Sequence, residues 1–101
     1  MFRPLIPYMR WELVPEEPND YSAHFLRGAI AARYRDWWVF HQHFGKQNIY
    51  RHPLVQYKCI DGILMVVGLS MGAELLEALE PPNELILNGI LVKFREVRKV
   101  V

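Results

Sequence analysis

The sequence predicts an α+β fold in which a strand, a helix, two strands, a second helix and a last strand follow one another. Apolar residues recur at every second position in several segments and at steps of three and four in two others, which separates strands from helices. The Asp61-Gly62 pair between two apolar segments is a strong signal for a two-residue hairpin. We therefore expect one ferredoxin-like (RRM-like) βαββαβ domain over residues 1–101, an antiparallel sheet with two helices on one face.

The first strand is expected near residues 5–13, where apolar and polar side chains alternate and Trp11 falls on the apolar face. Pro4 and Pro7 favour an edge position or the start of a strand over a central strand, because proline donates no hydrogen bond to a neighbour. The segment 15–20, rich in proline, acidic residues and asparagine, is expected to be a loop.

The first helix is expected to begin after Asp20 or Ser22, either of which can cap it. Its apolar face is predicted to hold Ala23, Leu26, Ile30, Tyr34 and Trp37. Gly28 lies inside this helix, where glycine costs about 1 kcal/mol relative to alanine, so we expect close backbone packing or a ligand there. The long polar and aromatic segment 38–52 that follows is expected to be a functional loop.

The second half of the chain supplies the remaining elements. Residues 53–60 and 63–69 are predicted strands around the hairpin, and Ser70 can cap a short helix that Pro81-Pro82 stops. Residues 85–101 are predicted to form one long strand, bent at Asn88-Gly89.

The predicted third strand, residues 63–69, is apolar on both faces, whereas a strand in a one-sided sheet should alternate. We therefore expect the open face of the sheet to be covered. The cover would be a homodimer partner or a second domain outside this chain.

Composition leaves several protein classes open and disfavours others. Twelve basic residues oppose eleven acidic ones, for a formal net charge of +1, so bulk charge neither supports nor opposes a nucleic-acid partner. The single cysteine cannot form an internal disulfide, which suits a reducing compartment. The amino-terminus does not resemble a signal peptide, and the longest apolar run is too short to span a bilayer. We expect a cytoplasmic protein with no membrane partner.

His41 and His43 are the most reactive feature of the sequence. An imidazole with an unperturbed pKa of about 6.5 takes up and releases protons near neutral pH. Near His43, within fifteen positions, the sequence also holds Lys46, Tyr50, Arg51, Tyr57 and Lys58. This mixture suits cleavage of RNA by its own 2′-hydroxyl, in which a base, an acid and a cation act without metal or other cofactor.

Other interpretations stay open at this point. Histidines in polar loops are often surface residues without a role, and a zinc site that includes His24 and His52 lacks supporting cysteine or carboxylate spacing. Arginines of the first helix could bind phosphate with Lys46 and Arg51, or simply form a solvated face. The arginines in question are Arg27, Arg33 and Arg35.

Five strings of the sequence resemble a known family. They are LRGAI at 26–30, FHQH at 40–43, YRHPLVQYK at 50–58, DG at 61–62 and VGL at 67–69. They are similar to the amino-terminal domain of the CRISPR-associated repeat-RNA endoribonucleases, in particular the subtype b branch. The resemblance spans residues 20–75.

The resemblance implies binding of CRISPR repeat RNA and one metal-independent cut per repeat that leaves a 2′,3′-cyclic phosphate. By position in the matching strings, His41 and His43 become the catalytic candidates. Tyr50, Tyr57 and Lys58 become supporting candidates. For RNA binding we name Arg27, Arg35, Lys46 and Arg51. His52 stands where many relatives have an aromatic residue.

Members of this family carry two ferredoxin-like halves, so we expect this chain to be the amino-terminal half of a longer protein. The same sequence features are compatible with two other functions besides the endoribonuclease. One is a non-catalytic RNA-binding or oligomerisation module of the same fold, and the other is a homodimer that binds a small ligand between sheets.

Overall fold

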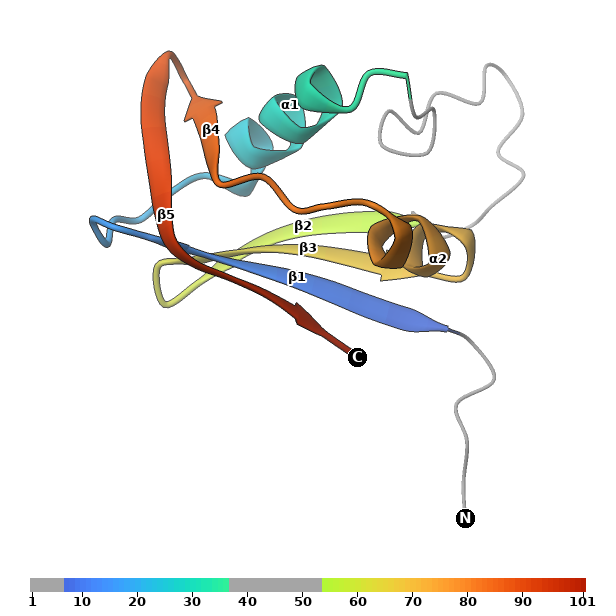
Figure 1. Cartoon of the computed structure of the whole chain (residues 1–101). Helices are drawn as coiled ribbons and strands as arrows, with labels where there is room; N and C mark the ends of the chain where they lie inside the picture. Colours follow the sequence, from blue (N-terminus) through green and yellow to red (C-terminus); the bar gives the residue numbers. More distant parts are fainter. Residues whose placement is uncertain (1–6, 37–53) are drawn as a thin grey trace.

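The computed structural model describes residues 7–36 and 54–101 (Figure 1). The elements are β1 (Tyr8–Pro15), α1 (Ala23–Arg33), β2 (Val55–Ile60), β3 (Ile63–Leu69), α2 (Met71–Ala78), β4 (Glu84–Leu87) and β5 (Ile90–Val100). Among these residues no helix is long and apolar enough to cross a membrane.

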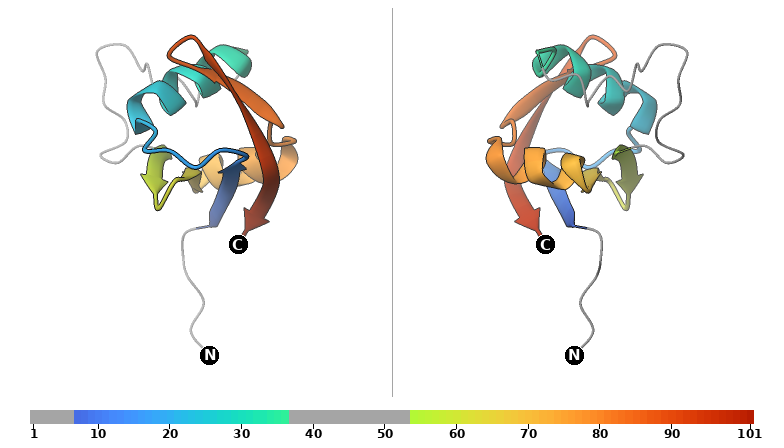
Figure 2. Two further views of the ribbon diagram at one scale, coloured as in Figure 1. Left: turned by 90° about the vertical axis from the view of Figure 1, so that its left-hand side faces the viewer. Right: turned by 90° about the vertical axis from the view of Figure 1, so that its right-hand side faces the viewer.

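The five strands form one antiparallel sheet in the order β2-β3-β1-β5-β4. This arrangement confirms the predicted ferredoxin-like α+β fold. β1 is the central strand, and it starts directly after Pro7, so the proline marks a strand start and not an edge. At its other end, a register shift between Val14 and Pro15 interrupts the pairing with β5. The side views show that the sheet curls, so that β4 rises toward α1 (Figure 2).

Both helices pack on the same face of the sheet, as predicted. Trp11 of β1 is fully buried among side chains of α1, α2 and β3, and its indole Nε1 donates a 2.9 Å hydrogen bond to the Leu76 carbonyl. Leu26 and Ile30, from the predicted apolar stripe of α1, are fully buried in the same core. A buried tryptophan with its polar atom satisfied fixes the position of α2 over β1.

The two helix starts differ in how they are capped. Ser22 caps α1, because its hydroxyl oxygen accepts a 3.2 Å hydrogen bond from the His24 backbone N–H. Ser70 takes the N-cap position of α2 with a φ of 56°, and its side chain makes no capping hydrogen bond. Its backbone N–H instead donates to the Pro7 carbonyl at 2.9 Å, which holds the start of α2 against the start of β1.

The predicted long strand at the carboxyl end is wrong in one respect. Residues 84–100 form a hairpin of two strands, and Asn88 and Gly89 are its two-residue turn. Their φ angles of 50° and 79° are the left-handed pair that a type I′ turn requires. Asp61 and Gly62 adopt the same conformation in the β2–β3 turn, as predicted.

Glycines allow the backbone around α2 to pack closely. A Cβ atom on Gly68 would lie 2.6 Å from the Gly72 backbone, and one on Gly72 would clash with the Leu54 carbonyl oxygen. Gly28 differs, because it is exposed and a Cβ atom added there would have no described atom within 4 Å. The expected close backbone packing at Gly28 is therefore wrong for the described residues.

Candidate functional site

Many of the predicted site residues belong to the segment 37–53, between α1 and β2. Those outside the described residues are His41, His43, Lys46, Tyr50 and Arg51. The structure does describe Arg27, Arg35, Tyr57 and Lys58, together with the residues that flank that segment on both sides.

The end of α1 is fixed by Tyr34. Its backbone N–H closes the helix on the Ile30 carbonyl at 2.9 Å, and its hydroxyl donates a 2.7 Å hydrogen bond to the Glu80 carbonyl. Its ring lies 5.7 Å from the Trp11 ring, centroid to centroid. Tyr34 therefore joins the last turn of α1 to the chain just after α2 and to the core.

The start of β2 is held near the other end of α2, at its first turn. Leu54 is buried, and its carbonyl oxygen accepts a 2.8 Å hydrogen bond from the Leu69 N–H. The same carbonyl faces Gly72 in the first turn of α2. Tyr34 precedes the histidine-containing segment and Leu54 follows it. Both are thus anchored close to α2, one near each of its ends.

Tyr57 projects from β2 into the core side of the sheet, where it is partly buried and packs against the hydrophobic core. Burial raises the pKa of the Tyr57 hydroxyl well above its ordinary value, and the positive charge of Arg27 opposes that shift. The phenol therefore stays protonated at neutral pH. In that form it can donate a hydrogen bond or a proton, but it cannot act as a base.

Lys58 projects from the opposite face of β2. It is exposed and stands beside Met65 of β3 on the open side of the sheet. The alternation of side chains along the strand explains this separation, and it places Gln56 on the same side as Lys58. The structure therefore does not bring Tyr57 and Lys58 together, although they are neighbours in the matching string.

The arginines of the α1 side are exposed. Arg27 lies in the middle of the helix, and Arg33 and Arg35 lie at its end, just before the segment 37–53. Exposed guanidinium groups next to the predicted catalytic segment are suited to contact phosphate groups. Among the described residues, no group of three histidine, cysteine or acidic side chains could hold a metal ion.

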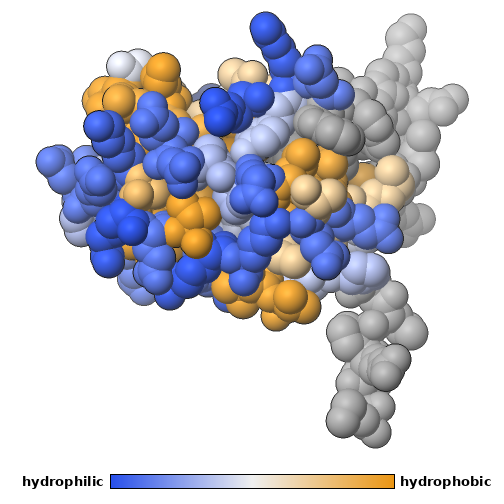
Figure 3. Space-filling model, in the orientation of Figure 1, coloured by the Kyte–Doolittle hydropathy of each residue, from blue (hydrophilic) through white to orange (hydrophobic). Residues whose placement is uncertain are grey.

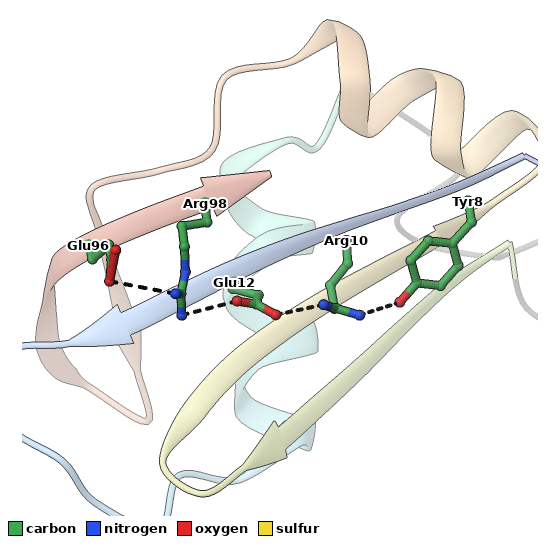
Figure 4. Close-up of polar contacts among 5 residues, drawn as sticks. All are labelled: Tyr8, Arg10, Glu12, Glu96 and Arg98. Atoms are coloured by element: carbon green, nitrogen blue, oxygen red, sulfur yellow. Dashed lines mark hydrogen bonds and ion pairs between the residues drawn. The ribbon is translucent and has the colours of Figure 1, made fainter. Parts of the chain in front are cut away.

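The open face of the sheet holds a row of polar contacts that the sequence pattern did not predict (Figure 4). Arg10 donates to the Tyr8 hydroxyl and to the Glu12 carboxylate, both at 2.8 Å. Arg98 of β5 pairs with Glu12 at 3.0 Å and with Glu96 at 3.9 Å. The sequence contains part of the pattern, because these residues occupy alternate positions of their strands and so lie on one face. The pairing itself depends on the register between β1 and β5, which local pattern does not give.

This row of polar side chains covers part of the open face. The apolar residues predicted on both faces of β3 are present, since Leu64 and Val66 face the core while Met65 and Val67 face the other side. Val67 is nevertheless buried, and it stands directly opposite Arg10. Side chains of β1 therefore cover part of the apolar strand.

Comparisons with known proteins agree with this architecture. Residues 5–99 match the family model described as the Cas6b N-terminal domain. A solved structure titled "Crystal structure of Cas6b" is 27% identical, with a TM-score of 0.74; the match covers 94% of this chain and 45% of that one. No curated protein sequence matches the chain.

The chain thus spans just under half the length of the solved relative. The family match extends over nearly the whole chain, beyond the strings at 20–75, and it confirms the resemblance found in the sequence. This chain belongs to the Cas6b N-terminal domain family.

Proposed function

We propose that this chain is the amino-terminal part of a CRISPR repeat-RNA processing protein and that it supplies the groups that cut the RNA. The observation that carries the proposal is the family match over residues 5–99, together with the 0.74 TM-score to a Cas6b structure. The proposed substrate is the repeat of a precursor transcript. The proposed products are a 2′,3′-cyclic phosphate and a free 5′-hydroxyl.

The proposed chemistry uses His41 and His43 as the base and the acid. One imidazole removes the proton of the 2′-hydroxyl, the 2′-oxygen attacks the adjacent phosphorus, and the bond to the 5′-oxygen breaks as the other imidazole protonates it. Each such proton transfer accelerates a reaction typically by ~10²–10⁴-fold. No metal ion takes part in these steps, and Tyr50 is a further supporting candidate.

Two described residues support this chemistry by their positions. Tyr57 carries a protonated phenol on the core side of β2, four positions into the chain that leaves the segment 37–53, and it can donate to a phosphate oxygen. Arg27 lies close enough for its charge to act on the Tyr57 hydroxyl. Arg35, Lys46 and Arg51 are the further candidates for phosphate contacts.

The test is cleavage of repeat RNA in the presence of EDTA by the natural protein that contains this chain. We expect the wild-type protein to cut without added metal and to leave a cyclic phosphate, which mass spectrometry of the product identifies. The combined His41→Ala and His43→Ala variant should bind the RNA with unchanged affinity and should not cut it.

Normal cleavage by that double variant would contradict the proposed catalytic role of this domain. Retained RNA binding would then favour a non-catalytic binding module of the same fold. Chelation that abolishes cleavage by the wild-type protein would instead contradict the metal-independent mechanism.

A further inference from the structure

The β4–β5 hairpin exposes an apolar surface at its tip. Ile90 is 65% exposed and Leu91 is 49% exposed, and Phe25 of α1, 40% exposed, lines the same groove beside the hairpin. Figure 3 shows apolar side chains gathered at the hairpin tip. Large apolar side chains that gather at one place on a surface often mark an interaction site.

The backbone of β5 has an open edge at this place. The Glu16 N–H donates a 2.9 Å hydrogen bond to the Lys93 carbonyl, and after Glu16 the chain turns away toward α1. On the other side of β5, Ile90 and Val92 pair with Leu87 and Leu85 of β4.

The backbone N–H and C=O groups of successive residues in a strand point alternately toward the two neighbouring strands. This alternation determines to which side the backbone groups of Leu91 point. A two-residue hairpin closes on a hydrogen-bonded pair, here Leu87 and Ile90, so Val92 also bonds toward β4. Leu91 lies between them and directs its N–H and C=O to the opposite side, as Lys93 does. No backbone group of the described residues forms a hydrogen bond with Leu91 on that side.

A groove of about 520 Å³ borders this edge. It runs between β5 and the segment that leads into α1, and Phe25, Ile90 and Leu91 are among the apolar residues that line it. Glu16, Glu17 and Asp20 contribute carboxylates, and Lys93 is the one cationic side chain among the described residues that line it. The groove is therefore acidic, which disfavours RNA and favours a basic partner.

We propose that this groove binds an extended, basic segment of a partner protein, which adds to the sheet as a short strand beside Leu91. Its backbone would bond to the Leu91 N–H and C=O. Its apolar side chains would contact Phe25, Ile90 and Leu91, and its lysine or arginine side chains would face Glu16, Glu17 and Asp20. Strand addition of this kind takes affinity from main-chain hydrogen bonds and specificity from alternate side chains. The proposal does not depend on the cleavage reaction.

The test uses a synthetic acetylated peptide of alternating lysine and valine, eight residues long, added to the natural protein that contains this chain. We expect saturable binding by calorimetry and NMR shifts concentrated at the Leu91 and Lys93 amides. A peptide with glutamate in place of lysine should bind at least tenfold more weakly. Methylation of its main-chain nitrogens should also abolish binding by the lysine peptide.

Two variants locate the site. The combined Glu16→Lys and Glu17→Lys variant should reverse the preference, so that the glutamate peptide binds better than the lysine peptide. Leu91→Ser should weaken binding at least fivefold, whereas Ile86→Ser, which alters the exposed cross-strand neighbour outside the groove, should not. Thermal denaturation of each variant checks that it is folded.

Three results would overturn the proposal. The first is the absence of peptide binding at millimolar concentration, or binding that the charge reversal leaves unchanged. The second is displacement of the peptide by repeat RNA, which would assign the groove to nucleic acid. The third is self-association that Leu91→Ser abolishes, which would assign the surface to a second copy of the chain.

Discussion

The Tyr34 hydroxyl donates a hydrogen bond of 2.7 Å to the carbonyl oxygen of Glu80, 46 positions away in the chain. The bond joins the end of α1 to the chain just beyond Leu79, the C-cap of α2. Because the same tyrosine packs against Trp11, whose indole nitrogen donates to α2, three elements meet at one side chain. The chain that leaves this point enters the segment of the predicted catalytic histidines.

Tyr34→Phe should therefore affect both stability and cleavage. The ring would keep its contact with Trp11, while the lost hydrogen bond should lower the free energy of unfolding by about 1 kcal/mol. We expect the single-turnover cleavage rate of repeat RNA to fall several-fold with unchanged RNA affinity. Urea denaturation and pre-steady-state kinetics measure the two effects.

Tyr21→Phe is the matched control for this variant. The Tyr21 hydroxyl donates a 2.9 Å hydrogen bond to the Glu17 carbonyl, in the segment before α1 and far along the chain from α2. Its loss removes a similar bond and should leave cleavage unchanged. Equal effects of the two variants on cleavage would show that Tyr34 acts only through general stability.

Substitutions of Tyr57 and Lys58 should have different effects on the cleavage rate. Tyr57→Phe should lower the cleavage rate about tenfold or more, because the phenol lies on the same side of β2 as Arg27 and α1. Lys58→Ala should change the rate less than twofold, because the side chain lies on the open face of the sheet. A larger loss for Lys58→Ala than for Tyr57→Phe would place the reaction on the other face.

Alkaline pH should destabilise the fold through Tyr57. Burial raises the pKa of its hydroxyl in the folded state, so the folded state favours the neutral phenol. Stability from this source is complete below the ordinary tyrosine pKa of about 10 and is lost as pH rises above it, by at most about 1.4 kcal/mol per pH unit. The Tyr34 hydroxyl, whose pKa partial burial also raises, acts in the same direction.

The measurement is the free energy of unfolding from pH 8 to pH 11, for the wild type and for Tyr57→Phe. The variant should show a shallower decline above pH 10. Identical slopes for the two proteins would mean that the Tyr57 hydroxyl ionises as readily in the folded state as in the unfolded one.

Two glycines should respond in opposite ways to alanine. Gly28→Ala should raise the free energy of unfolding by about 0.5–1 kcal/mol, because the site is exposed in a helix and open to a methyl group. Gly72→Ala should lower it by more than that, because the new Cβ would clash with the Leu54 carbonyl. Chemical denaturation of both variants tests the contrast, and a stabilising Gly72→Ala would contradict the packing around α2.

The elements that sequence predicted well are those set by local pattern. β3 occupies residues 63–69 as predicted, and Asp61-Gly62 forms the predicted turn because its conformation depends on those two residues. The Leu26 and Ile30 stripe of α1 is also correct, since the helical period alone places it on the buried side.

The features that sequence missed depend on contacts between distant segments. Asn88-Gly89 is the exception, because the pair carries the same local turn signal as Asp61-Gly62, although a bend in one strand was predicted there. The pairing of Glu12 with Arg98 depends on a strand register, and the need for Gly72 depends on the passage of Leu54 beside α2. In the candidate site, nearness in sequence grouped Tyr57 with Lys58, although strand alternation separates them.

The row of charges on the open face also determines how the molecule attracts other charged molecules. Arg10 and Arg98 are matched there by Glu12 and Glu96, so their fields largely cancel at distances longer than the ion pairs themselves. A polyanion diffusing toward the protein is therefore drawn little to this side. We expect long-range steering of a polyanion to depend more on the exposed arginines of α1, Arg27 and Arg33, than on this row.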